Sequence, residues 1–224
     1  MLSASAYERL FTAEKLELSI EDSESEPYKS KYAAREIWEE ELTKLIDDID
    51  KEANPDPDSV QLCRCVAASL AFKLGSNLIA TEEPPGAEER LRQCLNYLER
   101  AGSDPDESQV VDRISLLRIL CLNLLGFLRT ERGSPNDGLE FLLQAESSYK
   151  DYKELHSDLV PWDLHRLWSK AAGLKLQSIS PEESGNLWQQ LEEAHTYTLY
   201  YLAQVSIKVA NLSNQGFSGS GRGA

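Results

Sequence analysis

The sequence is poor in the residues that break helices. Its 224 residues include only nine prolines and twelve glycines. Leucine, glutamate, alanine and lysine are frequent, and these residues have high helix propensity. No stretch alternates polar and apolar residues in the way a half-buried strand would. The sequence therefore predicts an all-α fold.

Cysteine and histidine are also scarce, which bears on metal sites and catalysis. The four cysteines, all in apolar helical surroundings, are Cys63, Cys65, Cys94 and Cys121. We interpret them as reduced, buried thiols. Side chains two positions apart on a helix point in directions that differ by about 200°. Cys63 and Cys65 are therefore poorly placed to bind the same metal ion. The three histidines are scattered, without a His-Glu-x-x-His pattern. We expect no metal, no cofactor, no catalytic residues and no enzyme activity.

Positive charge is in short supply. The net charge is −15, and the segment Met1–Asp58 holds 17 acidic against 7 basic residues. Nucleic acids and anionic membranes repel such a chain. We therefore expect no nucleic-acid partner, and any electrostatic partner should be basic.

Long apolar runs are missing as well. The longest, Ile114–Leu128, is interrupted by Arg118 and Asn123 and is too short to cross a bilayer. No apolar signal peptide follows Met1. These features predict a soluble cytoplasmic protein without membrane insertion.

Apolar residues recur at helical spacing in seven segments. Helices are expected at Ser5–Ser19, Tyr28–Lys51, Val60–Ala80, Ala87–Ala101, Ser108–Thr130, Gly138–Tyr152 and Pro181–Ser213. We divide the chain into an acidic N-terminal helical pair (1–58), two further helix pairs (59–152), a long loop or irregular helix (153–180), a final unpaired helix (181–213) and a disordered Gly/Ser tail (214–224).

Two of the helix pairs share a spacing that indicates an internal repeat. Small, bulky and small residues follow each Leu-Gly at the same offsets, in the sets Leu74-Gly75, Ala87, Leu91, Cys94 and Leu125-Gly126, Gly138, Leu142, Ala145. Small residues allow helices to approach closely, as in tetratricopeptide repeats. The two glycines are 51 residues apart, whereas the usual period is about 34 residues. Ordinary helical hairpins remain the alternative to an atypical tetratricopeptide-like α-solenoid of antiparallel helix pairs.

The last helix fits only half of this pattern. Leu202-Ala203 takes the Leu-Gly place, but Gln215, Gly219 and Arg222 stand at the small and bulky positions. We expect the solenoid to be truncated after the first helix of a third repeat. The tyrosines of this helix would then be uncovered and available for self-association.

Two stretches resemble the KIF-binding protein family. They are EPYKSKYAAR (Glu26–Arg35) and HTYTLYYLAQV (His195–Val205). The resemblance covers about Tyr7 to Val205, and family members continue well beyond it. It implies a helical, tetratricopeptide-type solenoid that binds kinesin motor domains and regulates their microtubule attachment. Axonal and mitochondrial transport, neuronal development and a cytoskeleton-associated location in the cytoplasm are implied by the same resemblance.

The predicted groove of the solenoid is apolar and aromatic. The expected protein contacts are Phe72, Asn123, Phe127, Tyr197, Tyr200, Tyr201 and Gln204. None is basic, which disfavours a groove that grips carboxylates and favours an amphipathic helix or a folded surface. Tyr200 and Tyr201 could instead be core residues. Because tubulin is itself acidic, we expect no direct microtubule binding. A generic scaffold that binds another helical partner is the alternative function.

Overall fold

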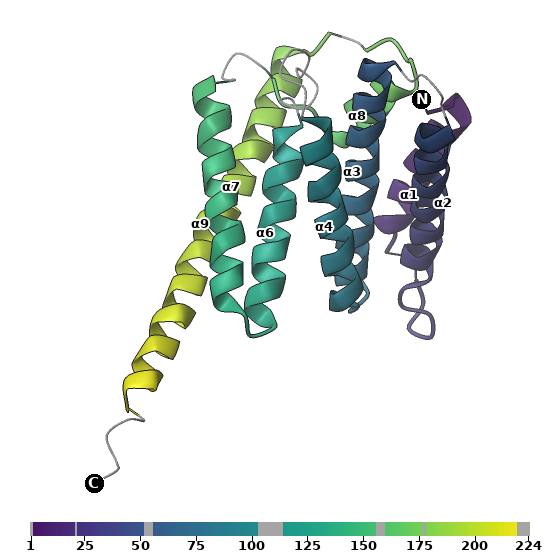
Figure 1. The fold of residues 1–224 in the computed structure, drawn as a ribbon. Helices are drawn as coiled ribbons and strands as arrows, with labels where there is room; N and C mark the ends of the chain where they lie inside the picture. Colours follow the sequence, from purple (N-terminus) through teal and green to yellow (C-terminus); the bar gives the residue numbers. More distant parts are fainter. Residues whose placement is uncertain are drawn as a thin grey trace.

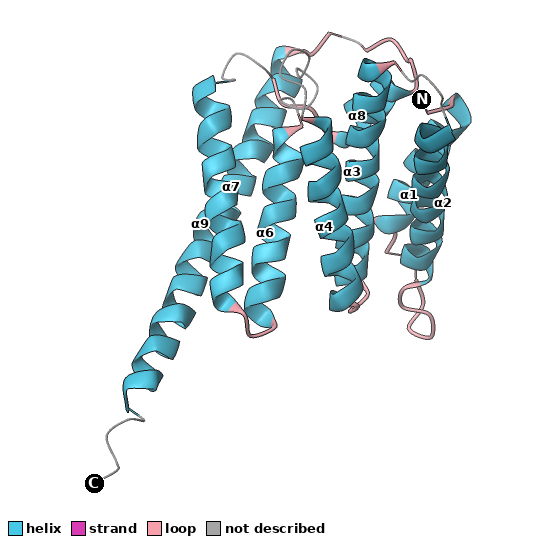
Figure 2. Ribbon diagram, viewed as in Figure 1, coloured by secondary structure: helices cyan, strands magenta, loops and turns pink. Residues whose placement is uncertain are grey.

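The computed structural model describes residues 2–20, 22–51, 56–102, 114–155, 160–176 and 178–218, apart from the side chains of residues 50 and 214–218. Its helices are α1 (Ala4–Glu17), α2 (Lys29–Lys51), α3 (Pro57–Ala80), α4 (Pro84–Ala101), α6 (Ser115–Glu131), α7 (Pro135–Leu155), α8 (Leu164–Ala171) and α9 (Pro181–Ser218). Within these ranges the chain has no strand, as Figure 2 shows. The all-α prediction is confirmed.

The helices form a row of antiparallel pairs (Figure 1). The pairs are α1 with α2, α3 with α4, and α6 with α7. Neighbouring pairs contact each other through α2 and α3 and through α4 and α6, and α9 packs on α7 and α6. This arrangement is an α-solenoid, as expected. The assignment to the tetratricopeptide type stays a prediction.

Helix starts follow capping residues that lie further upstream than the apolar pattern indicated. The Asp56 carboxylate accepts a hydrogen bond of 3.0 Å from the Ser59 N–H, and Pro57 is the first residue of α3. The apolar pattern predicts that this helix begins at Val60, three residues later. Proline suits the first turn because its missing N–H is not needed there. The Asp-Pro step therefore begins the helix rather than breaking it.

Both repeat-like pairs are closed by the same kind of contact. A Cβ atom added at Gly75 of α3 would lie 2.7 Å from Cγ of Leu91 in α4. At Gly126 of α6 it would lie 2.5 Å from Cγ of Leu142 in α7. Gly138 is just as confined, since its added Cβ would lie 2.7 Å from the Gly126 carbonyl oxygen. Glycine is thus required for the close approach of the helices.

The main hydrophobic core centres on α3. Its buried residues come from α1, α2, α3, α4, α6 and α8. By length and composition α3 is apolar enough to cross a membrane, yet 72% of its most apolar window is buried by its neighbours. A core helix has the same composition, so this property needs no membrane. A smaller cluster at α6, α7 and α9 surrounds Tyr152 and Leu191.

The segment predicted as a loop or irregular helix holds a short regular helix. Helix α7 continues to Leu155, and the eight-residue helix α8 (Leu164–Ala171) follows later in the segment. The Trp168 indole N–H donates to the Ser69 hydroxyl at 2.8 Å, and Trp168 is fully buried. Contact with α3 therefore fixes α8. Residues 156–159 and 177, and the predicted helix start at 108–113, lie outside the described residues.

The final helix is longer than expected. It packs on the preceding pair, α6 and α7, and the absence of a second helix in its own repeat stays a prediction. It ends at Ser218 rather than Ser213, so residues 214–218 of the predicted tail are helical. Beyond α7 the helix projects away from the row (Figure 1). Residues 219–224 lie outside the described part.

Candidate protein-binding surface

Four aromatic rings gather where α9 crosses α6. The Tyr201 ring centroid lies 5.6 Å from that of Phe127, 5.5 Å from that of Tyr200 and 6.4 Å from that of Tyr197. The Gln204 side-chain amide donates to the Tyr200 hydroxyl at 2.6 Å. We call these five residues the tyrosine patch. The structure thus brings together five of the seven contacts predicted from the sequence.

The tyrosine patch is layered from a buried base to an exposed rim. Tyr201 is half-buried against Phe127, whereas Tyr197 and Tyr200 are 58% and 56% exposed. Burial raises the pKa of Tyr201, and the neighbouring Tyr197 and Tyr200 raise it further. The alternative of tyrosines as core residues therefore describes Tyr201 in part but not Tyr200. Exposed aromatic rings of this kind are typical anchors of protein interfaces.

A buried polar clamp holds α9 in this position. The Asn123 amide of α6 donates to the Ala194 carbonyl oxygen at 2.9 Å, and its oxygen accepts from the Thr198 hydroxyl at 2.8 Å. Asn123 is only 3% exposed. The prediction that Asn123 contacts a partner is therefore corrected: α9 covers it, and it positions the patch. A second tie is the ion pair between Lys208 and Glu131, at 2.7 Å.

Phe72 also lies apart from the predicted groove surface. It lines a cavity of about 100 Å³ together with Leu116, Leu120, Trp162 and Leu164. None of these residues belongs to the tyrosine patch. The segment leading into α8 covers this part of α3, which the sequence could not indicate because Trp162 is far from Phe72 along the chain. Phe72 is a half-buried packing residue, and its contact with a partner stays a prediction.

A polar cluster between α7 and α9 was missed by the sequence analysis. The His195 ring stacks on Tyr149, with centroids 3.6 Å apart and planes at 4°, and Nε2 lies 2.6 Å from a Glu146 oxygen. The Tyr149 hydroxyl donates to Glu192 at 2.5 Å, and Lys153 pairs with Glu192 at 2.7 Å. Burial, followed by Glu192, raises the pKa of Tyr149 to about 12. The signal was available: residues 146, 149 and 153 share one helix face.

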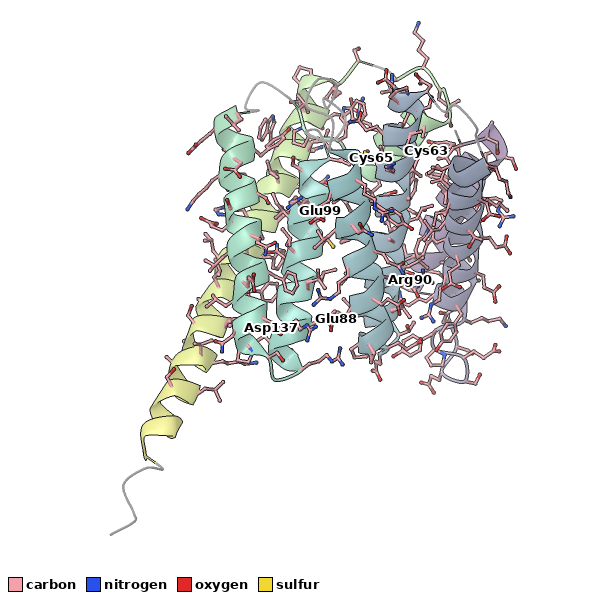
Figure 3. All side chains as sticks on the ribbon, in the orientation of Figure 1. Cys63, Cys65, Glu88, Arg90, Glu99 and Asp137 are labelled. Atoms are coloured by element: carbon pink, nitrogen blue, oxygen red, sulfur yellow. The ribbon has the colours of Figure 1, made fainter. Side chains whose placement is uncertain are left out.

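Three arginines surround one buried carboxylate between α4 and α6. The Glu88 oxygens lie 2.6 Å from Arg129, 2.8 Å from Arg132 and 3.0 Å from Arg92. Figure 3 shows Glu88 in this interface, beside Asp137 at the start of α7. Burial raises the pKa of Glu88, but Arg92 and the other two arginines outweigh it and hold the pKa below its usual range. This cluster joins two helix pairs.

The cysteines are buried thiols. All four are free, and burial raises the pKa of Cys65 to about 12. A thiol with so high a pKa is a poor nucleophile and a poor metal ligand at neutral pH. Over the described ranges, no three His, Cys, Asp or Glu side chains are grouped as metal ligands.

The row of helix pairs is that of an α-solenoid, a class of protein that binds partners on extended helical surfaces. The exposed tyrosine patch is consistent with such a binding role. No family model matches the chain. It is 32% identical over 187 residues to the KIF-binding protein of Gallus gallus and 33% identical over 209 residues to that of Homo sapiens. These alignments cover 84% and 81% of the chain. The Drosophila melanogaster KIF-binding protein is 28% identical over 193 residues.

The chain is a relative of the KIF-binding proteins. It spans about three tenths of the length of the curated relatives, 28% for the chicken protein and 30% for the human one. These relatives are named for binding rather than for catalysis.

Proposed function

We propose that the chain binds kinesin motor domains through the tyrosine patch and so regulates their microtubule attachment and transport. The relatives' name provides the class of partner. The observation that carries the proposal is the exposure of Tyr197 and Tyr200 on a helix fixed to α6 by buried hydrogen bonds. A preorganised aromatic surface loses little conformational entropy on binding.

Charge supports the same partner. The chain has a net charge of −15, while the surface by which a motor contacts acidic tubulin is basic. Within residues 194–207 of α9 the sequence has no acidic side chain, so the patch itself is uncharged, and most of the acidic excess lies in residues 1–58. Apolar anchors with charged surroundings give both affinity and electrostatic steering. We place this activity in the cytoplasm, at the cytoskeleton and without direct microtubule binding.

A generic scaffold for another helical partner is the second candidate. It uses the same patch, since an amphipathic helix fits an aromatic groove. The two candidates differ in the partner, so titration with a kinesin motor domain separates them. Neither candidate requires a catalytic residue or a cofactor.

The test is calorimetric titration of a motor domain with the whole chain and its variants. Tyr200→Ala and Tyr197→Ala should each weaken binding by about tenfold or more, as truncated aromatic anchors do. Leu143→Ala is the matched control, because Leu143 is 54% exposed on α7 and outside the patch. Equal affinities of the tyrosine variants and the control would overturn the assignment of the patch. Circular dichroism confirms that each variant is folded.

A further inference from the structure

The turn between α1 and α2 presents two exposed serine hydroxyls. Ser23 and Ser25 belong to the sequence EDSESEP (Glu21–Pro27). Both side chains are exposed, and their hydroxyls form a hydrogen bond of 2.9 Å with each other. Neither residue is helical. A kinase binds its substrate serine in an exposed, non-helical segment. The turn between α1 and α2 is exposed and non-helical.

These serines are not needed to cap α2. The neighbouring Asp22 already does so, because its carboxylate accepts from the Ser30 N–H at 3.1 Å and from the Ser30 hydroxyl at 2.7 Å. Ser30 is buried, so this contact anchors the turn to the helix. The Ser23 hydroxyl is therefore presented at the surface without a role in holding the fold.

Acidic side chains follow Ser23 at two positions. Glu24 stands one residue after it and Glu26 three residues after it, and both are exposed. Glu26 pairs with Lys29 at 2.8 Å, but the two side chains are 59% and 69% exposed. Exposed pairs of this kind contribute little stability, so Glu26 can turn to another cation. Ser25 has Tyr28 at the corresponding third position.

We propose that Ser23 is a phosphorylation site for an acid-directed serine kinase, one with basic side chains beside the residues that follow the serine. The Ser23 oxygen forms a bond to the γ-phosphorus of ATP, and the bond from that phosphorus to the β,γ-bridging oxygen breaks. ADP leaves with the electron pair, and the hydroxyl proton passes to the kinase's catalytic aspartate. The phosphate adds a charge of about −1.5 to −2 to the turn.

Ser180 shares the acidic residue at the third following position and serves as an internal comparison. Glu183 stands three residues after it. Here, however, the Ser180 hydroxyl accepts from the Glu183 N–H at 3.1 Å, and the Glu183 carboxylate accepts from the Ser180 N–H at 2.9 Å. Both side chains are engaged in this reciprocal cap of α9. The structure thus distinguishes two serines that both have a glutamate at the third following position.

The experiment treats the whole chain with ATP and an acid-directed kinase of the casein kinase type, followed by mass spectrometry of phosphopeptides. Phosphate should appear first on Ser23, and Ser23→Ala should abolish this modification while Ser25→Ala retains it. Glu26→Gln should lower kcat/KM by about tenfold, since it removes one charge-assisted contact. Lys29→Gln is the matched control and should leave kcat/KM equal or higher.

Three results would overturn the proposal. One is no phosphate on Ser23 while a standard acidic peptide is modified in the same mixture. Another is equal modification of Ser23 and Ser180. The third is an unchanged rate in Glu26→Gln. Circular dichroism shows whether the variants are folded, and none of these side chains is buried.

Discussion

At the scale of single residues, two glycines set the distance between paired helices. Gly75→Ala and Gly126→Ala each place a methyl group against a leucine of the partner helix. We expect each to lower the free energy of unfolding by roughly 1–3 kcal/mol, as overpacking does. Gly185→Ala is the control, because nothing lies within 4 Å of its added Cβ. It should be neutral or stabilise by up to about 1 kcal/mol. Urea unfolding followed by circular dichroism measures all three, and a Gly126→Ala variant as stable as Gly185→Ala would contradict the packing.

Another residue-scale prediction concerns pH. Burial raises the pKa of Glu14, but hydrogen bonds from His165 and Lys73 outweigh it and lower the pKa to about 2, from 4.5. A lowered carboxyl pKa stabilises the fold above pH 4.5, and this contribution is lost as the pH falls from 4.5 toward 2. The hydrogen bond to Glu14 raises the pKa of His165. The stability that His165 contributes is therefore complete below the unfolded pKa and is lost as the pH rises through the folded pKa.

Glu14→Gln should lower the free energy of unfolding by roughly 1–3 kcal/mol at pH 6. The curves of the variant and the wild type should approach each other as the pH falls toward 2, because Glu14 is about half protonated there. Urea unfolding over this pH range is the measurement. Glu8→Gln, on the exposed side of α1, is the control and should follow the wild type. A constant difference between Glu14→Gln and the wild type at every pH would contradict the lowered pKa.

At the scale of elements, α9 depends on one asparagine. Asn123→Ala removes the hydrogen bonds to Ala194 and Thr198. Leaving buried polar groups unpaired costs about 1–3 kcal/mol. We expect faster amide hydrogen exchange in α9 and weaker motor binding, although Asn123 itself is covered. Thr196→Ala is the control, since that hydroxyl donates only to the exposed Glu192 backbone oxygen of its own helix. Unchanged exchange in α9 would contradict the clamp.

The helix boundaries show how much of the fold could be predicted from the sequence. Every predicted helix exists, but α3, α4 and α7 each begin three residues earlier, at Pro57, Pro84 and Pro135. The spacing of apolar residues does not include these prolines in the predicted helices, although proline suits the first turn of a helix. Five of the seven candidate contacts do cluster. Asn123 and Phe72 do not, because α9 and the segment before α8 cover them, and contacts between distant parts of the chain leave no local pattern.

At the scale of the whole molecule, apolar side chains remain exposed along the projecting part of α9. Besides Tyr197 and Tyr200, Ile207 is 63% exposed and Leu212 is 54% exposed. Exposed apolar surface of this kind favours association, so we expect the chain to self-associate at high concentration. Light scattering should show a mass that rises with concentration and falls in Ile207→Ser. Leu143→Ser is the control on α7. A monodisperse monomer at high concentration would contradict this expectation.

The central claim is that an acidic solenoid presents an aromatic patch to a basic motor domain. Its most direct test is titration of a kinesin motor domain with the folded chain at two salt concentrations. Binding that weakens as salt rises is the predicted result, because salt screens the attraction between the acidic chain and a basic motor surface. No binding by a chain that circular dichroism shows to be helical would contradict the claim.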